Sequence, residues 1–299
     1  MKHYIILSFY IFSCTNAKEE QKQITTREPR EWDAESYAQG NFVQEEAALH
    51  FLKESGINFI GKRVLDVGCG TGNITAKIAE TAKSVHGFDA SKNMIEYAQA
   101  TYDHFPNLSF EQCFAEDFIT TEKCDIAVSI FCLHWLEDKQ KVFENINNSL
   151  EIDGEFFGTI FSASDPASVG IIVLQELLQK PECSFLNNVT ITQKDSLLRY
   201  VISDEECKNI LQKAGFELIS YEKKSPVHTF KNRDELAAFQ RPLKMRLPLF
   251  QSLPETEREW LFNKYIDLFL TKLKKDENDH YIYQGTTTTI IHARKVKDI

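Results

Sequence analysis

The sequence predicts an α/β protein with a doubly wound parallel sheet. Two observations lead to this class. In the first half of the chain, apolar segments of strand length alternate with segments of helical periodicity. The first strand, Arg63–Val67, also runs directly into a loop with Gly at positions 68, 70 and 72, and a helical pattern begins at Asn73. Because strands that alternate with helices are joined by right-handed crossovers, they build a parallel sheet covered on both faces.

Hydrophobic periodicity and turn signals define the elements of the first half. A helix over 44–54 repeats apolar residues at helical spacing and ends at Gly56. Ser91 is placed to cap the helix that follows the second strand. The expected strands are Arg63–Val67, Ser84–Asp89, Leu108–Cys113, Asp125–Ile130 and Glu155–Phe161, and a helix over Lys139–Leu150 precedes the last of them.

The alternation ends after Ser162, and the second half is organised differently. We expect helices over Val169–Gln179 and Ser203–Ala214, a strand over Phe216–Lys223, two helical pieces between Asn232 and Lys275, and strands over Tyr281–Tyr283 and Thr286–Ala293. The predicted organisation is an N-terminal extension over 1–28 and one domain over 29–299, with insertions at about 162–200 and 232–275.

Composition and charge exclude several classes of function. The chain has 299 residues, a hydrophobic content of 42% and a net charge of −10. Proteins that bind nucleic acid usually show a basic balance or a basic stripe, so this charge argues against a nucleic-acid partner. The seven cysteines are scattered without a C-x-x-C pair, which predicts reduced thiols and no metal site.

The N-terminus has the pattern of a secretory signal. An apolar run over Tyr4–Ser13 follows Lys2 and precedes Ala17, a small residue at a cleavage-like position. The run is too short to span a membrane, so no membrane insertion is expected. The alternative interpretation is an extension that packs on the surface.

The glycine loop restricts the kind of ligand. Its glycines follow G-x-G-x-G, which is neither the dinucleotide fingerprint nor the phosphate-binding loop, and no Lys follows them. Asp66 lies two residues before Gly68, where a carboxylate favours a cationic ligand over a phosphate. The nine residues Val64–Gly72, VLDVGCGTG, resemble the signature loop of class I S-adenosylmethionine-dependent methyltransferases.

This resemblance implies a Rossmann-like, seven-stranded sheet with a helical cap insertion, and S-adenosyl-L-methionine as the cofactor. The domain over 29–299 is then a methyltransferase domain. The resemblance also implies that the last two strands form an antiparallel hairpin at one edge of the sheet. The helices over 232–275 are expected to form the cap over the site.

The ends of the strands supply the expected cofactor contacts. Asp66 is expected to hold the amino group of the methyl donor, and the glycines allow its close approach. Asp89, at the end of the second strand, is expected to accept both ribose hydroxyls, with helix capping as the alternative. Asp117 and the backbone N–H of Phe118 are expected to bind the adenine, with Glu116 as the competing acid. The full set is Asp66, Gly68, Cys69, Gly70, Gly72, Asp89, Ala90, Asp117, Phe118 and Phe131.

The segment after the fourth strand, where the transferred methyl group is expected to lie, reads SIFCLHWLED over 129–138. It resembles the small-molecule carboxyl methyltransferases, which include trans-aconitate methyltransferases, the malonyl-carrier-protein methyltransferase of biotin synthesis and insect juvenile hormone acid methyltransferases. In the last group, a Gln in an N-x-x-Q segment and the Trp of LHW are associated with binding the acid. These residues match Gln44 and Trp135. The alternative for Trp135 is that it is an aromatic residue of the hydrophobic core. Tyr37 precedes them, where the N-terminal lid of the family contacts the cofactor.

His134 and three cations are the remaining candidates. A carboxylate is already ionised near neutral pH, because its pKa is about 4.3, so its methylation needs no general base. His134 becomes a candidate base for a phenol or an amine. Arg241, Lys244 and Arg246 are either a clamp for an acid substrate or solvated surface charges.

The sequence therefore predicts an enzyme that transfers a methyl group to a small molecule, with a carboxylate as the favoured acceptor. One alternative is a malonyl-carrier-protein methyltransferase, whose expected basic docking patch finds no support in the net charge. The other is a non-catalytic protein that binds the cofactor or S-adenosylhomocysteine. Because the methyl donor is made in the cytosol, a cytoplasmic location is favoured over export through the N-terminal segment. The oligomeric state stays open.

Overall fold

The structure is a computed structural model that describes residues 31–120, 122–161, 169–186, 200–225, 227–244, 247–285 and 287–299. The signal-like segment up to Ala17 and the residue Arg246 lie outside these ranges, and so does the side chain of Lys244. The division of the chain into an extension, a domain and two insertions stays a prediction.

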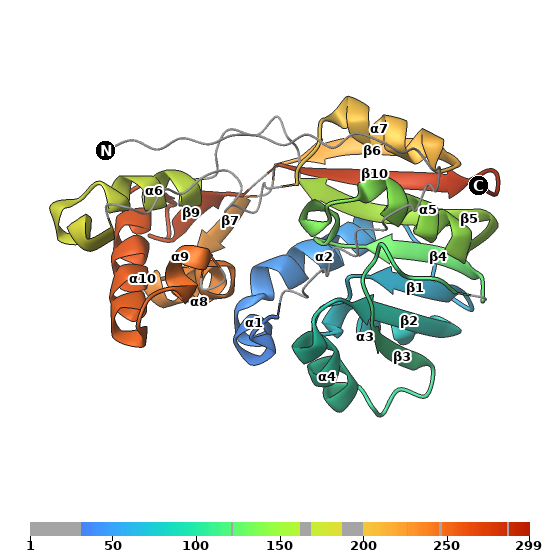
Figure 1. Cartoon of the computed structure of the whole chain (residues 1–299), viewed down its shortest axis with the longest axis horizontal. Helices are drawn as coiled ribbons and strands as arrows, with labels where there is room; N and C mark the ends of the chain where they lie inside the picture. Colours follow the sequence, from blue (N-terminus) through green and yellow to red (C-terminus); the bar gives the residue numbers. More distant parts are fainter. Residues whose placement is uncertain are drawn as a thin grey trace, which may run out of the picture.

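The main sheet of the described chain has seven strands in the order β3-β2-β1-β4-β5-β10-β6 (Figure 1). Neighbours from β3 to β5 run parallel, whereas β10 is antiparallel to both β5 and β6. The expected α/β class with a doubly wound seven-stranded sheet is confirmed, and the sheet is mixed. Its strands are β1 (Arg63–Val67), β2 (Ser84–Asp89), β3 (Leu108–Gln112), β4 (Cys124–Ser129), β5 (Leu150–Phe161), β6 (Phe216–Lys224) and β10 (Thr288–Lys295).

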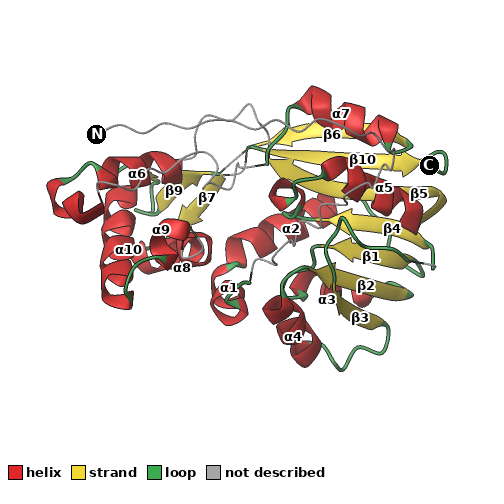
Figure 2. Ribbon diagram, viewed as in Figure 1, coloured by secondary structure: helices red, strands yellow, loops and turns green. Residues whose placement is uncertain are grey.

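Helices cover both faces of this sheet (Figure 2). One face packs on α2 (Phe42–Glu54) and α3 (Asn73–Ala79), and the other packs on α5 (Lys139–Ser149) and α7 (Asp204–Lys213). Successive strand residues point to opposite faces, so Val64 joins the first core and Leu65 the second. Because both faces are buried, the central strands are continuous apolar runs in the sequence.

Three further helical segments lie around the carboxyl edge of the parallel strands. They are α1 (Ala34–Gly40), α4 (Lys92–Thr101) and the single 3₁₀ turn η1 (Leu133–Trp135). Asp33 caps α1 by accepting from Ser36 N at 3.0 Å, and Ser91 caps α4 by accepting from Met94 N. The predicted cap at Ser91 is therefore confirmed.

A second lobe has its own small sheet and its own core, on the left of Figure 1. The sheet pairs β7 (Val227–Phe230) with β9 (Tyr281–Gln284), and β9 with β8 (Lys274–Lys275). Side chains such as Phe250, Phe262 and Phe269 are fully buried in this core. The helical segments of the lobe are α6 (Val169–Leu178), η2 (Pro181–Leu186), α8 (Arg233–Lys244), α9 (Pro248–Gln251) and α10 (Glu255–Leu270).

The expected hairpin of the last two strands is wrong. β9 belongs to the small sheet of the second lobe, whereas β10 lies inside the main sheet between β5 and β6. Ile291 of β10 pairs with Gly158 on one side and with Tyr221 on the other. Because β10 is buried along most of its length and β6 is half exposed, β6 takes the edge position.

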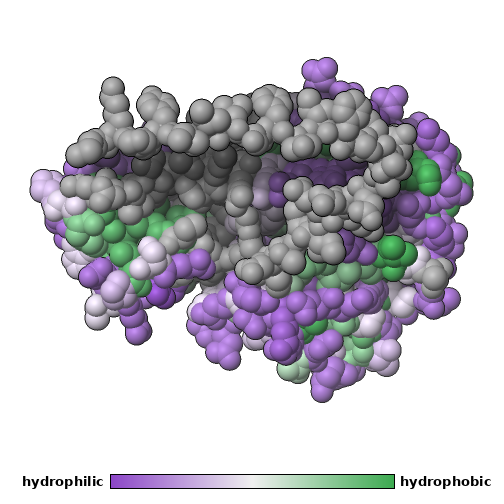
Figure 3. All heavy atoms as spheres, viewed as in Figure 1, coloured by the Kyte–Doolittle hydropathy of each residue, from purple (hydrophilic) through white to green (hydrophobic). Residues whose placement is uncertain are grey.

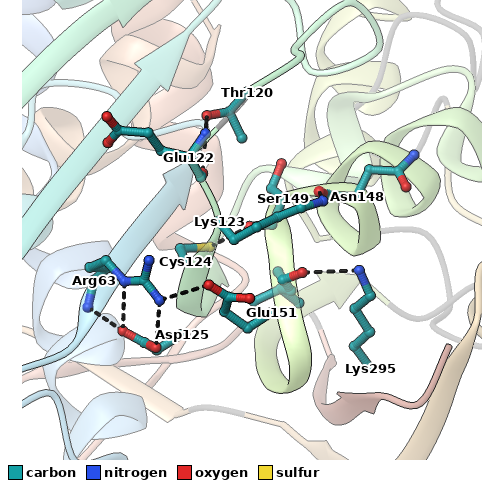
Figure 4. Close-up of polar contacts among 11 residues, drawn as sticks. Arg63, Thr120, Glu122, Lys123, Cys124, Asp125, Asn148, Ser149, Glu151 and Lys295 are labelled. Carbon is teal, nitrogen blue, oxygen red and sulfur yellow. Dashed lines mark hydrogen bonds and ion pairs between the residues drawn. The ribbon is translucent and has the colours of Figure 1, made fainter. Parts of the chain in front are cut away.

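A polar network holds the amino ends of the parallel strands together (Figure 4). The Arg63 guanidinium donates to Asp125 Oδ1 at 3.1 Å and to Glu151 Oε1 at 3.0 Å, which links the starts of β1, β4 and β5. The buried Lys295 Nζ donates to the Leu150 carbonyl at 3.0 Å, at the end of the antiparallel β10. This network lies at the amino ends of the parallel strands, whereas the glycine loop lies at their carboxyl ends.

The described surface is unevenly polar. On the face shown in Figure 3, hydrophilic residues predominate over α4, and hydrophobic residues gather over the second lobe. Ile172 and Phe185 of this lobe are about half exposed. In the described ranges, none of the helices has the length and apolarity needed to cross a bilayer.

Candidate active site

The glycine loop folds sharply between β1 and α3 because three glycines have positive φ angles. These angles are 77° at Gly68, 56° at Gly70 and 80° at Gly72, a region that other residues rarely adopt. A Cβ at Gly68 would lie 2.2 Å from Cys132 Sγ. Gly68 N and Cys69 N both donate to the Phe88 carbonyl, at 2.9 and 3.0 Å, which holds the loop against β2.

Asp66 and Asp89 place two carboxyl groups beside this loop. Asp66 is buried, and its Oδ2 accepts from Thr75 Oγ1 at 2.7 Å. Burial raises the pKa of Asp66 to about 7, the Thr75 hydroxyl opposes this shift, and the Asp89 charge adds to it. Asp89 accepts from Gly70 N at 3.1 Å and from Ser91 N at 2.9 Å. A positively charged ligand group near this pair would therefore stabilise the ionised form of Asp66.

Two cavities adjoin at the carboxyl ends of β1, β2 and β4. Both are bordered by Trp32, Gly68, Asp89, Cys132 and Trp135. The first, of about 200 Å³, extends along the glycine loop toward the second lobe. The second, of about 320 Å³, is lined further by Phe88, Ala90, Cys113, Phe114, Ala115, Glu116, Leu136, Glu137 and Tyr200.

The structure brings most of the predicted cofactor residues to these cavities. Asp66, Gly68, Cys69, Gly70, Asp89, Ala90 and Phe131 line one or both. Gly72, Asp117 and Phe118 are outside both linings: Gly72 is buried, Asp117 is exposed, and Phe118 stacks on Phe88 with ring centroids 4.1 Å apart. Glu116, the competing acid, lies on the wall of the second cavity. The binding roles of all these residues stay predictions.

The segment after β4 has a strained start and a buried imidazole. Phe131 has a φ of 55°, uncommon for a residue with a side chain, and its N–H donates to Thr159 Oγ1 at 2.8 Å. His134 is 3% exposed and stacks on Phe161 with ring centroids 3.8 Å apart. Among the described residues, His134 Nδ1 has no hydrogen-bond partner. Burial lowers the pKa of His134 to about 3, so the ring is neutral and weakly basic.

The N-terminal segment forms another wall of the first cavity, to which Trp32, Tyr37, Asn41 and Gln44 contribute. Glu31 fastens this segment to the start of α4, where it accepts from Ser91 Oγ at 3.0 Å and from Asn93 N at 3.2 Å. Trp32 packs edge-on against Trp135 with ring centroids 5.7 Å apart. Within the described chain, Gln44 Oε1 is buried without a hydrogen-bond partner.

The second lobe closes the first cavity with residues that the sequence did not single out. They are His228 of β7, Phe239 and Gln240 of α8, and Tyr283 of β9. None of them belongs to a motif, and only the three-dimensional arrangement brings these elements together. Arg241, a predicted clamp residue, is instead paired with Glu259 through two hydrogen bonds of 2.6 and 2.8 Å. No Lys or Arg among the described residues lines either cavity.

A parallel sheet with a glycine loop after its first strand, and with adjoining cavities over its carboxyl edge, defines a Rossmann-like protein that binds a small organic cofactor. A family model described as methyltransferase domain matches residues 59–215, which is more than half of the chain. The chain belongs to this family.

The comparisons with individual proteins agree with this assignment. The chain is 26% identical over 279 residues to methyltransferase 235L of Invertebrate iridescent virus 6, whose name assigns that activity provisionally; the match covers 90% of this chain and 92% of the viral protein. It is 30% identical over 134 residues to juvenile hormone acid O-methyltransferase of Bombyx mori, and here it spans 41% of this chain and 48% of the insect protein. The solved YcgJ protein from Bacillus subtilis has the same fold, with a TM-score of 0.55 at 19% identity over 84% of this chain and 99% of that one.

The protein is therefore an S-adenosylmethionine-dependent methyltransferase, as the sequence predicted. The non-catalytic alternative is set aside by this assignment. The chemical class of the acceptor is a separate matter.

Proposed function

We propose that this methyltransferase esterifies a small-molecule acid by transferring the methyl group to its carboxylate. The observation that carries the proposal is the state of the imidazoles in the first cavity. Burial lowers the pKa of His134 to about 3, and it also lowers the pKa of His228. A phenol or an amine would need a base of higher pKa to remove its proton, whereas a carboxylate needs none.

The residues at the carboxyl edge fit the cofactor. The positive φ angles of the glycine loop bring backbone close to the cavity, and Asp66 offers a buried carboxyl group to the ammonium group of a ligand. We assign the adenosine to the second cavity, with Asp89 toward the ribose and Glu116 rather than Asp117 near the adenine. S-adenosylmethionine supplies an electrophilic methyl group on a sulfonium.

The chain itself contributes orientation and the exclusion of water. Phe131, Trp135 and Phe161 line the first cavity together with the glycine loop. In an apolar setting of this kind, attraction between the acid and the sulfonium is strong, and both charges disappear during transfer. The side-chain amide nitrogen of Gln44, which lines this cavity, is assigned as a donor to the acid group, and Trp135 to its flank.

The charges around the first cavity favour an acid with a single carboxylate. The ionisable acids on its wall are Glu45, Asp66 and Asp89, and no described Lys or Arg side chain faces them there. A second carboxylate would therefore be buried without a cation and close to other negative charges. An apolar monocarboxylic acid satisfies these walls, in keeping with the partial similarity to the insect enzyme that is named for an acid substrate.

The test uses methyl-labelled S-adenosylmethionine and a panel of terpenoid acids, fatty acids, and di- and tricarboxylic acids. We expect label in the monocarboxylic acids and its release by mild base, because methyl esters are base-labile. An Asp89→Ala variant, expected to lose the cofactor, is the negative control. Label that resists base would mark an amine, ether or carbon acceptor and would overturn the proposal.

A further inference from the structure

Gln240 presents a hydrogen-bond donor to the first cavity from the second lobe. Its side chain is 3% exposed and forms part of the cavity wall. Its Oε1 accepts a hydrogen bond of 3.0 Å from the Tyr265 hydroxyl. Tyr265, on α10, is fully buried behind α8 and does not reach the cavity. Because the oxygen of the amide is held by Tyr265, the amide nitrogen is directed away from it.

The amide oxygen of Gln240 is hydrogen-bonded to Tyr265, whereas its amide nitrogen has no acceptor among the described residues and is not one of the fully buried unpaired atoms, so we take it to be open to the cavity. An amide whose oxygen is held and whose nitrogen is open to a cavity can donate a hydrogen bond to a ligand oxygen there. In Figure 1, α8 belongs to the second lobe, whereas α3, which follows the glycine loop, lies against the main sheet. Because Gln240 lines the first cavity from this other lobe, we assign it to the end of the acceptor away from the transferred methyl group.

Two ionisable groups next to Gln240 bring no free positive charge to it: His228 is neutral and Arg241 is paired. His228 shares this wall, and burial lowers its pKa, with a smaller opposing effect from Glu46, so its ring is neutral. The ring of His228 lies near those of Phe239 and Tyr283, at centroid distances of 6.3 and 6.1 Å. The guanidinium of Arg241, the next residue, is hydrogen-bonded to Glu259 and lies over the ring of Phe262. The wall is therefore suited to a neutral oxygen and unsuited to a second anion.

We propose that Gln240 binds an uncharged oxygen at the end of the acceptor remote from its carboxylate, and that Tyr265 positions the Gln240 amide for this contact. The inference rests on the proposed function, since it takes the reacting end of the acceptor to be the carboxylate. The substrate is then an acid with two functional ends: one carboxylate beside the glycine loop, and a hydroxyl, ether or carbonyl oxygen against α8. The apolar body between them packs on the aromatic walls.

The experiment compares pairs of monocarboxylic acids of equal length, one with a terminal hydroxyl or keto oxygen and the other with a terminal methyl group. For the wild-type enzyme, we expect kcat/KM to favour the oxygenated acid by about fivefold at the best length, the usual effect of one hydrogen bond. Gln240→Met removes the donor at similar volume, so the preference should disappear through a higher KM for the oxygenated acid. The plain acid, which makes no hydrogen bond to Gln240, is the internal reference against which the preference is calculated.

Two further variants separate recognition from structure. Gln240→Glu, assayed at a pH at which its carboxyl group is ionised, keeps the bond from Tyr265 but has no donor, so it should lose the preference even if Gln240→Met folds poorly. Tyr265→Phe should weaken the preference alone and have no added effect together with Gln240→Met, because it acts only through the amide. Gln251→Met, an exposed change on α9 of the same lobe, is the matched control and should keep the preference. Cofactor affinity measured by calorimetry should be equal in all of them.

Equal use of both acids by the wild-type enzyme, or a preference that survives in Gln240→Met and Gln240→Glu, would overturn this inference and leave ester formation intact. Failure to methylate any acid, with transfer of base-stable label elsewhere, would instead refute the proposed function and the inference with it. A preference that persists or increases in Gln240→Glu alone would mean that the site accepts a hydrogen bond from the substrate, which also contradicts the inference.

Discussion

At the scale of single residues, the carboxyl group of Asp66 makes the free enzyme sensitive to pH. Its pKa is about 7 in the folded chain, chiefly because it is buried, and near its ordinary value of 3.8 in the unfolded chain. Between these values the folded state holds a proton that the unfolded state has lost. The free energy of unfolding therefore falls as the pH rises from about 4 to about 7, and it should fall less in Asp66→Asn.

The same group should control the pH dependence of cofactor binding. A ligand ammonium favours the ionised carboxylate, so we expect S-adenosylmethionine to bind more tightly as the pH rises toward about 7, by up to about tenfold per pH unit. Calorimetric titrations below the pKa of the ligand's amino group, about 7.7, would measure this slope. Thr75→Val, which removes the hydroxyl that lowers the pKa, should move the midpoint upward. An unchanged slope in Asp66→Asn would exclude this role.

Gly68 and Gly61 allow the effect of a clash to be separated from that of backbone strain. Both have positive φ angles, 77° and 69°, but a Cβ at Gly61 would meet nothing within 4 Å, whereas one at Gly68 would meet Cys132. We expect Gly61→Ala to cost about 1 kcal/mol of unfolding free energy and Gly68→Ala about 3 kcal/mol or more, with loss of cofactor affinity. Urea denaturation would show this difference. Equal costs would mean that the loop can move away from Cys132.

At the scale of elements, the attachment of the N-terminal segment to α4 should govern access to both cavities. Glu31 accepts three hydrogen bonds there, from Ser91 Oγ, Lys92 N and Asn93 N. Removal of this charge from a helix N-terminus releases the segment that carries Trp32. We expect Glu31→Ala to weaken S-adenosylmethionine binding by about fivefold, mainly through faster dissociation, which surface plasmon resonance would measure.

Glu35→Ala is the control for this prediction, since Glu35 is exposed in the first turn of α1. It should leave the dissociation rate of the cofactor unchanged. An equal loss in the two variants would point to the net charge of the segment instead of the contact with α4.

The elements that the sequence predicted and those that it missed differ in their physical basis. Strands β1, β2 and β4 were predictable because each contains buried apolar residues and is followed by a turn and a helical pattern. The short α1 and β7 carry no comparable periodicity, and both are stabilised by contacts with distant parts of the chain. The wrong hairpin has the same origin. Neighbours in sequence suggested a pair, but β10 pairs with β5 on one side and with β6 on the other, and both of these partners are distant in the sequence from β9.

The residues of the candidate site also fall into those that the sequence predicted and those that it missed. Asp66, Asp89 and Trp135 were predictable because each lies at the end of a strand next to a motif. Gln240 and His228 come from elements without a motif, and their place on the cavity wall depends on how the second lobe packs. Asp117 and Glu116 are adjacent, and the side that each one faces is decided by the turn, which composition and spacing do not determine.

At the scale of the whole molecule, the polar network that stabilises the main sheet and the cavities of the candidate site lie at opposite ends of its parallel strands. The network of Arg63, Asp125 and Glu151 holds the amino edge (Figure 4), whereas both cavities lie at the carboxyl edge. The Arg63 side chain is 37% exposed, so water screens part of its attraction. We expect Arg63→Met to lower the free energy of unfolding by about 1 kcal/mol and to leave kcat/KM unchanged.

Chemical denaturation and steady-state assays on the same preparation would check this separation. Arg294→Met, which removes a single pair with a distance of 3.9 Å to Glu217, should have a smaller effect on stability. A fall in kcat/KM for Arg63→Met would mean that the two edges are coupled through the strands.

The indoles of Trp32 and Trp135, which are in contact, should give the enzyme an intrinsic fluorescence signal that responds to ligands. The chain has three tryptophans, and these two border both cavities. The third, Trp260, packs against the core of the second lobe on α10. Most of the intrinsic fluorescence that responds to ligands should therefore come from one pair of indoles at the cofactor. Excitation near 295 nm (approximately the red edge of tryptophan absorption) would follow occupancy of the unlabelled wild-type enzyme, and Trp260→Phe would remove the background without touching either cavity.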